Sequence, residues 1–171
     1  MHPYFELVER SARLTLHALK EAEDRVPRMG GTTAAVKTLQ AIRLQKAIIA
    51  VGMFSMLESI LQDRLKSKNG FTEARRCLKV QKQVALEKRF SQFNAAINVL
   101  KHGLGKSYEA LLKHKQLPFR IKHPGDAFFF EGDASEVTTL VDVDNKFVMD
   151  CAQLIRDVSN VVREVHPGAA L

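Results

Sequence analysis

Apolar and polar residues alternate with a helical period along the first two thirds of the chain. Apolar side chains recur three or four positions apart, which is the spacing that places them on one face of an α-helix. The pattern predicts five helices in this part of the chain, over about residues 3–26, 33–68, 72–85, 86–102 and 106–115.

Turn and capping residues mark the ends of these helices. Pro27 follows the first helix, and Thr32 or Thr33 is a suitable N-cap for the second. Asn69-Gly70 is a stop signal for the second helix, and Gly103 is one for the fourth. The second helix is the longest, at about 54 Å for a rise of 1.5 Å per residue.

The helical spacing of apolar residues is lost between about residues 117 and 143. Residues 118–122 and 127–131 are predicted to be strands of a small β-hairpin, and residues 138–143 a third short strand. A two-stranded hairpin is marginally stable alone, so we expect Phe128–Phe130 to pack it against the helices.

A tight turn and a final helix complete the predicted architecture. Pro124 and Gly125 suit the central positions of a type II turn, because glycine tolerates the positive φ required there. Asp144 is a suitable N-cap for a last helix that runs to about residue 164. The sequence predicts one all-α domain over residues 1–171, an antiparallel helical bundle with a β-hairpin insert before the C-terminal helix.

The composition excludes several classes of protein. With 46% hydrophobic residues the chain is not a disordered segment, and two cysteines do not make a disulfide scaffold. The longest apolar stretch, Ala47 to Leu57, rises about 16 Å as a helix, roughly half a bilayer core. The N-terminus has no basic region followed by an apolar core. We therefore expect a cytoplasmic protein without a membrane span, with Cys77 and Cys151 as reduced thiols.

The net charge of +7 is distributed unevenly. Residues 1–123 hold 23 basic and 10 acidic residues, whereas residues 124–171 hold 3 basic and 9 acidic ones. The excess is greatest over residues 64–122, which carry 15 lysines and arginines, Lys88 and Arg89 among them, against three glutamates. Such a face attracts polyanions such as RNA, although a run of charge is also typical of a solvated helix face.

The fourth predicted helix carries a polar edge beside its apolar stripe. Asn94, Asn98 and His102 lie four residues apart, so they share one edge of the helix. One interpretation is that they form hydrogen bonds to neighbouring helices. The other is a polar site at the end of the helix, with His102 as the titratable group and Lys101 beside it.

The segment Asn98-Val-Leu-Lys101-His102-Gly103 resembles the signature of the HEPN superfamily, helical bundles that include metal-independent ribonucleases of toxin–antitoxin and phage-defence systems. The resemblance implies a homodimer in which two such motifs face each other, with His102 as the catalytic histidine and Asn98 at the polar position. The family's arginine falls on Ile97, which departs from the pattern. Another cation, Lys101, Lys106 or Arg120, would then have to stabilise the phosphate.

The loop after His102 is a second candidate. Gly103-Leu-Gly105-Lys106-Ser107 could hold a phosphate at the start of a helix, or it could be a plain turn in which Ser107 is the N-cap. Asn94, Tyr108 and Glu58 are further pocket candidates. Glu58 lies in a polar patch that is either the solvent face of the second helix or a wall of the His102 site.

Other chemistries lack a motif. No acidic or histidine cluster has the spacing of metal ligands, and no serine or cysteine has the context of a nucleophile, so we expect neither a metal nor another cofactor. Three function classes remain: an RNA-associated HEPN-like protein with weakened or lost ribonuclease activity, a non-catalytic module that binds a partner protein, and a nucleotide-binding bundle.

Overall fold

The computed structural model describes residues 4–168, and within them the fold is all-α, as predicted. The elements are α1 (Tyr4–Glu23), the short 3-10 helix η1 (Val26–Met29), α2 (Thr33–Leu65), α3 (Gly70–Val80), α4 (Val84–His102), α5 (Lys106–Leu112) and α6 (Asn145–Val165). The predicted long second helix is α2, with 33 residues.

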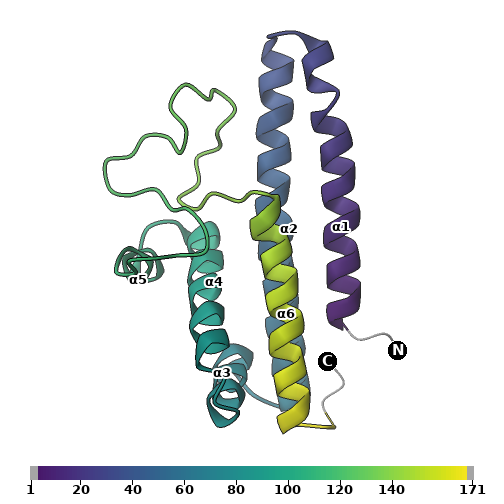
Figure 1. Ribbon diagram of the computed structural model, residues 1–171, viewed down its shortest axis with the longest axis vertical. Coiled ribbons are helices and arrows are strands. Elements are labelled where there is room, and N and C mark those ends of the chain that lie inside the picture. The colour runs from purple at the N-terminus through teal and green to yellow at the C-terminus, as the bar shows by residue number, and fades with distance from the viewer. Residues whose placement is uncertain (1–3, 169–171) are drawn as a thin grey trace.

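The C-terminal helix α6 is the centre of the bundle. It lies in front of α2 in Figure 1, with α1 on one side and α3 and α4 on the other, and it contacts all four. Two aromatic clusters fill the core. Phe54, Phe71 and Phe90 join α2, α3 and α4, with ring centroids between 5.3 and 6.3 Å apart. Phe93 and Phe147 join α4 and α6, at 5.2 Å.

The N-caps predicted for the second and the last helix are confirmed. The Thr32 side chain accepts a hydrogen bond from the Ala35 backbone N–H, at 3.2 Å. The Asp144 carboxylate accepts one from Phe147 N–H, at 2.7 Å. These bonds satisfy backbone donors that the first turn of a helix leaves free.

The predicted end of the second helix is three residues too late. Helix α2 ends at Leu65, and Lys66 adopts the left-handed conformation at φ 50°. Asn69 is not part of this stop, since its side chain caps α3 by accepting from Thr72 N–H at 2.9 Å. Gly70 is then the first residue of α3, where a Cβ would lie 2.6 Å from that of Leu61.

The boundary between the third and fourth helices was also misplaced. Helix α3 ends at Val80, and Lys82 takes a positive φ of 55°. The backbone N–H groups of Lys82 and Gln83 donate to the carbonyls of Lys79 and Leu78. This is a Schellman motif with lysine where glycine is usual, which is why the sequence carried no stop signal there.

The predicted β-hairpin is wrong, although its turn is correct. Gly125 has φ 97°, and Asp126 N–H donates to the His123 carbonyl at 3.0 Å, as a type II turn requires. Residues 127–131 do not pair with residues 118–122, and no strand is present in residues 4–168. Instead Ile121 forms a single antiparallel bridge with Val141, in the segment predicted as the third strand.

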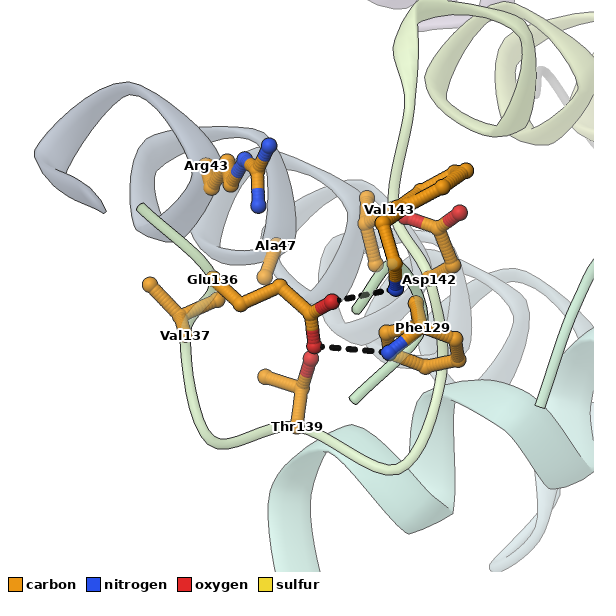
Figure 2. Close-up of a pocket in the computed structure, with 9 residues that line it drawn as sticks. Arg43, Ala47, Phe129, Glu136, Val137, Thr139, Asp142 and Val143 are labelled. Atoms are coloured by element: carbon orange, nitrogen blue, oxygen red, sulfur yellow. Dashed lines mark hydrogen bonds between the residues drawn. The ribbon is translucent and has the colours of Figure 1, made fainter. Parts of the chain in front are cut away.

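Side chains, rather than a neighbouring strand, form the hydrogen bonds to the backbone of the predicted hairpin. The Glu136 carboxylate accepts hydrogen bonds from the backbone N–H groups of Phe129 and Phe130, at 2.9 and 2.6 Å (Figure 2). Arg120 and Lys122 donate to the carbonyls of Phe129 and Ala127. The backbone groups that a second strand would offer are therefore already satisfied.

The aromatic anchor of this segment also differs from the prediction. Phe128 and Phe130 are 56% and 50% exposed, so they do not hold the segment against the bundle. Phe119 does so, with its ring 5.1 Å from that of Phe93 and 5.3 Å from that of Phe147.

Candidate functional site

The end of α4 places a polar edge beside a buried stripe, as the sequence predicted. Phe90 and Phe93 are fully buried, and Ile97 is 2% exposed. Asn98 is half-buried and His102 is exposed on the adjacent edge. The side chain at position 97 therefore points into the core, so an arginine there could not reach a ligand at His102 without leaving the apolar stripe.

An open groove of about 270 Å³ lies at this end of α4. It is lined by Asn98, His102, Gly103, Leu104, Gly105, Lys106 and Ser107. The sequence motif and the glycine loop, predicted as two candidates, thus form one site. Gly103 adopts φ 72° and Gly105 φ 153°, values that other residues rarely take, and they turn the chain back between the two helices.

Ser107 is not the N-cap of the following helix. Gly105 holds that position, and no side chain caps the helix. Helix α5 has only seven residues. Ser107 therefore lines the groove without capping α5.

Exposed lysines lie on the groove, at Lys106, and in the chain that precedes and follows its lining residues. Lys101, Lys106, Lys113 and Lys115 are all exposed, and none of them forms an ion pair within the described part of the chain. Glu109 is the one acidic residue of α5. No arginine lines the groove. The positive charge there is carried by lysine.

Other candidate residues serve the fold instead. Arg89 pairs with Asp150 of α6 at 3.1 Å, and its guanidinium lies 5.6 Å from the centre of the Phe93 ring. Tyr108 is buried, and its hydroxyl donates to the Lys122 carbonyl at 2.6 Å. This bond connects α5 to the segment before α6.

The remaining candidates lie away from the groove lining. Arg120 is exposed and stacks over Phe130, at 4.3 Å from the ring centre. Neither Asn94 nor Glu58 lines the groove, and Lys88 is exposed near the start of α4. The Glu58 carbonyl lies close to Gly70, at the opposite end of the bundle from His102.

A buried ion pair that the residue pattern did not predict organises the segment before α6. Lys122 and Glu136 lie 3.2 Å apart, and their side chains are 9% and 6% exposed. Burial raises the pKa of Glu136, but the hydrogen bonds from Phe129, Phe130 and Lys122 outweigh it and hold this pKa below its usual value. The available signal for this buried pair was the position of Lys122, which follows the apolar Ile121 in a predicted strand.

A small cavity of about 20 Å³ lies between this segment and α2 (Figure 2). Arg43 of α2 and Asp142 are among its lining residues. Burial raises the pKa of Asp142, and the nearby Asp144 raises it further. Arg43 pairs with Asp133, whose pKa is lowered by Ser135 and by Arg43 despite burial. The Arg43–Asp133 pair fastens the segment to α2, because it joins groups 90 residues apart in the sequence.

Residues 4–168 contain neither a group of side chains placed as metal ligands nor an exposed thiol. No three His, Cys, Asp or Glu side chains there are grouped as metal ligands. Cys77 and Cys151 are buried free thiols, and burial raises the pKa of both. A raised pKa leaves less of the nucleophilic thiolate.

Helix α2 is the one described helix with the length and apolar composition to cross a bilayer. A third of its most apolar stretch is buried inside the protein. Buried helices of proteins that never enter a membrane reach the same hydropathy, so this property assigns no location.

Comparisons of the chain with protein-family models, curated proteins and solved structures found no match. The resemblance to the HEPN superfamily therefore rests on residues 98–103 and stays a prediction.

Proposed function

We propose that the protein binds RNA at the groove between α4 and α5. The observation that supports this proposal is the joint placement of Asn98, His102, Lys106 and Ser107 on one open groove. The unpaired lysines beside it supply the charge that a phosphate backbone requires.

Each lining residue has a distinct role in this proposal. Lys106 contacts a phosphate as a point charge, and the Asn98 amide and Ser107 hydroxyl bond to sugar or phosphate oxygens. His102 is exposed and can accept or donate a proton at a ribose 2′-hydroxyl. Cleavage would follow attack of that 2′-oxygen on the adjacent phosphorus, with departure of the 5′-oxygen.

The proposed activity is RNA binding with weak or no cleavage. Ile97 is in the core, and lysine cannot reproduce the two parallel hydrogen bonds of an arginine to a phosphate. Loss of such stabilisation of a charged transition state lowers a rate by roughly 100- to 1,000-fold.

Fluorescence anisotropy with labelled single-stranded RNA tests the binding. We expect Lys106→Ala to weaken binding and to reduce its salt dependence by about one phosphate contact. Lys20→Ala, which removes an exposed lysine from α1, is the matched control and should change binding little. Equal effects of the two substitutions, or no binding at low salt, would contradict the proposal.

A cleavage assay separates binding from catalysis. The protein and its His102→Ala variant are incubated with end-labelled RNA in the presence of a metal chelator. Slow cleavage that disappears in the variant indicates a residual ribonuclease. Binding without cleavage in either protein supports a binding function alone. Cleavage that continues unchanged in the variant excludes His102 as its acid or base.

A further inference from the structure

The outer face of α2 is mainly apolar, and none of the helices in residues 4–168 covers it. Its residues lie within an arc of about 120° on the side away from buried Ala50 and Leu57. We define this α2 outer face as Ala41, Leu44, Gln45, Ile48, Gly52, Ser55, Met56 and Ser59. Leu44, Ile48 and Met56 are 51%, 53% and 59% exposed. A Cβ placed on Gly52 would meet nothing within 4 Å.

Charge is confined to the two ends of this face. Between Lys37 and Asp63 the charged residues of α2 are Arg43, Lys46 and Glu58. Arg43 and Lys46 fall on the opposite side of the helix, and Glu58 falls on its flank, about 40° beyond Leu44. Lys37 and Asp63 are both exposed and lie on the same side as Ile48. They are about 39 Å apart along the helix.

We propose that the α2 outer face binds the same face of a second copy, with the two α2 helices antiparallel and a two-fold axis at the level of Ala50. In this arrangement residue numbers that sum to 100 face each other. Lys37 then faces Asp63 of the other copy at both ends.

The sizes of the side chains fit the same register. Ile48 faces Gly52, Leu44 faces Met56, and the small or polar residues pair among themselves, so the two helices approach closely at the axis. A parallel arrangement would place Lys37 opposite Lys37 and Asp63 opposite Asp63. The charges therefore select the antiparallel one.

Helix α1 packs beside α2. Tyr4 donates a hydrogen bond to the Met53 carbonyl at 2.9 Å, which fixes α1 beside α2. Leu7 and Leu14 are 52% and 64% exposed and lie on the side of α1 away from Glu9, which pairs with α6. They are exposed apolar side chains of α1, and Leu14 also borders Arg10 and Arg13 in an open pocket.

A lipid surface fits this face less well than a second copy does. Helices that lie on membranes combine apolar residues with a rim of lysines and arginines, and they often carry Trp or Phe. The α2 outer face has uncharged Gln45, Ser55 and Ser59 among its apolar residues and no aromatic residue. Small and polar residues of this kind suit close contact between helices.

Sedimentation velocity over a range of protein concentrations tests the assembly. We expect a species of twice 19.2 kDa, which Ile48→Glu converts to a monomer. Val80→Glu, at a position 62% exposed on α3, is the matched control and should remain a dimer. A wild-type monomer at all concentrations overturns the proposal, as does a dimer that Ile48→Glu does not weaken. Monomer that floats with anionic vesicles would instead assign the face to lipid.

Charge reversal tests the orientation at two exposed positions, of which Asp63 also pairs with Lys66 and Arg64 of its own chain. Lys37→Glu and Asp63→Lys should each weaken the dimer by roughly threefold to thirtyfold, because each disturbs two exposed pairs. The double variant restores both pairs and should return to the wild-type affinity. Additive weakening in the double variant rejects the antiparallel register.

Cross-linking provides a second measure of the register. A short bismaleimide should join Gln45→Cys to Ser55→Cys when the two variants are mixed. It should join neither variant to itself. Cys77 and Cys151 are buried and remain unmodified. Self-linking of Gln45→Cys would instead show a parallel dimer.

Discussion

On α4, side chains close in sequence lie either in the core or on the candidate groove. Ile97 is buried and Asn98 is half-buried, while His102 one turn later is exposed. A 100° step per residue is enough to move a side chain from the core to a groove. The HEPN resemblance would require an arginine at position 97, but this position lies on the core side of the helix. The proposed activity is therefore RNA binding with little or no cleavage.

The residue scale is also where the sequence was most informative about the site. Asn98, His102, Lys106 and Ser107 are within ten positions of one another, so their grouping on one groove needed only helical geometry and a glycine turn. Arg89 and Tyr108 could not be judged in this way. Their partners, Asp150 and the Lys122 carbonyl, are remote in sequence.

Lys82 offers a test of backbone strain at a single residue. Its φ of 55° is unfavourable for a residue with a Cβ, so Lys82→Gly should stabilise the protein by about 0.5–1 kcal/mol in urea unfolding. Lys79→Gly, in the last turn of α3, should destabilise it by up to about 1 kcal/mol. If both glycines destabilise equally, the Schellman ending of α3 is incorrect.

At the scale of elements, local signals were sufficient to locate the helices but not the ends of α2 and α3, and they were insufficient for the segment before α6. N-caps such as Thr32 and Asp144 act on their own first turn, and the sequence identified both. The missing hairpin has a different cause. Glu136 reaches back to the backbone of Phe129 and Phe130, a competition between side chain and strand that residue alternation does not reveal.

The buried Lys122–Glu136 pair should dominate the stability of this segment. Glu136→Gln removes the charge that faces Lys122 and weakens two backbone hydrogen bonds, so we expect a loss of about 3 kcal/mol at pH 7. The lowered pKa of Glu136 means that its ionised form stabilises the fold above the usual glutamate pKa of about 4.3. The loss should therefore shrink as the pH falls through the lowered pKa.

Urea unfolding between pH 3 and pH 7 measures this difference. Glu131→Gln, at an exposed position of the same segment, is the control and should stay within about 0.5 kcal/mol of the wild type. A pH-independent difference for Glu136→Gln would show that its carboxylate charge is not what stabilises the segment.

Removal of the Asp142 charge should have the opposite effect on stability to removal of the Glu136 charge. Its pKa is raised by burial and by Asp144, so its ionised form destabilises the fold at pH values above that raised pKa. Asp142→Asn should stabilise the protein at pH 7, by less than about 1 kcal/mol because the side chain is partly solvated. The gain should disappear below the usual aspartate pKa of about 3.9. A destabilised Asp142→Asn protein at pH 7 would mean that Arg43 and Arg120 outweigh its burial.

At the scale of the whole molecule, the uneven charge of the sequence is partly an internal arrangement. Three of the nine acidic residues after position 123 pair with basic residues before it, at Arg43–Asp133, Arg89–Asp150 and Lys122–Glu136. The lysines left unpaired around the groove are one part of the excess that a polyanion can reach, and the exposed Lys79, Lys82 and Lys88 of the α3–α4 region are another. Composition alone does not separate these two groups, because the division depends on which residues the fold brings together.

The proposed dimer links assembly to stability at this same scale. If folded chains associate through the α2 outer face and unfolded chains do not, the melting temperature must rise with protein concentration. Circular dichroism melts at about 1 and 100 µM should therefore differ for the wild type, by several degrees if dissociation falls in this range. For Ile48→Glu the two melts should coincide. Lys106→Ala should retain the concentration dependence of the wild type, because the groove shares no residue with the α2 outer face. Loss of that dependence in Lys106→Ala would mean that assembly and the groove are coupled, with the groove lying at or near the contact between the two chains.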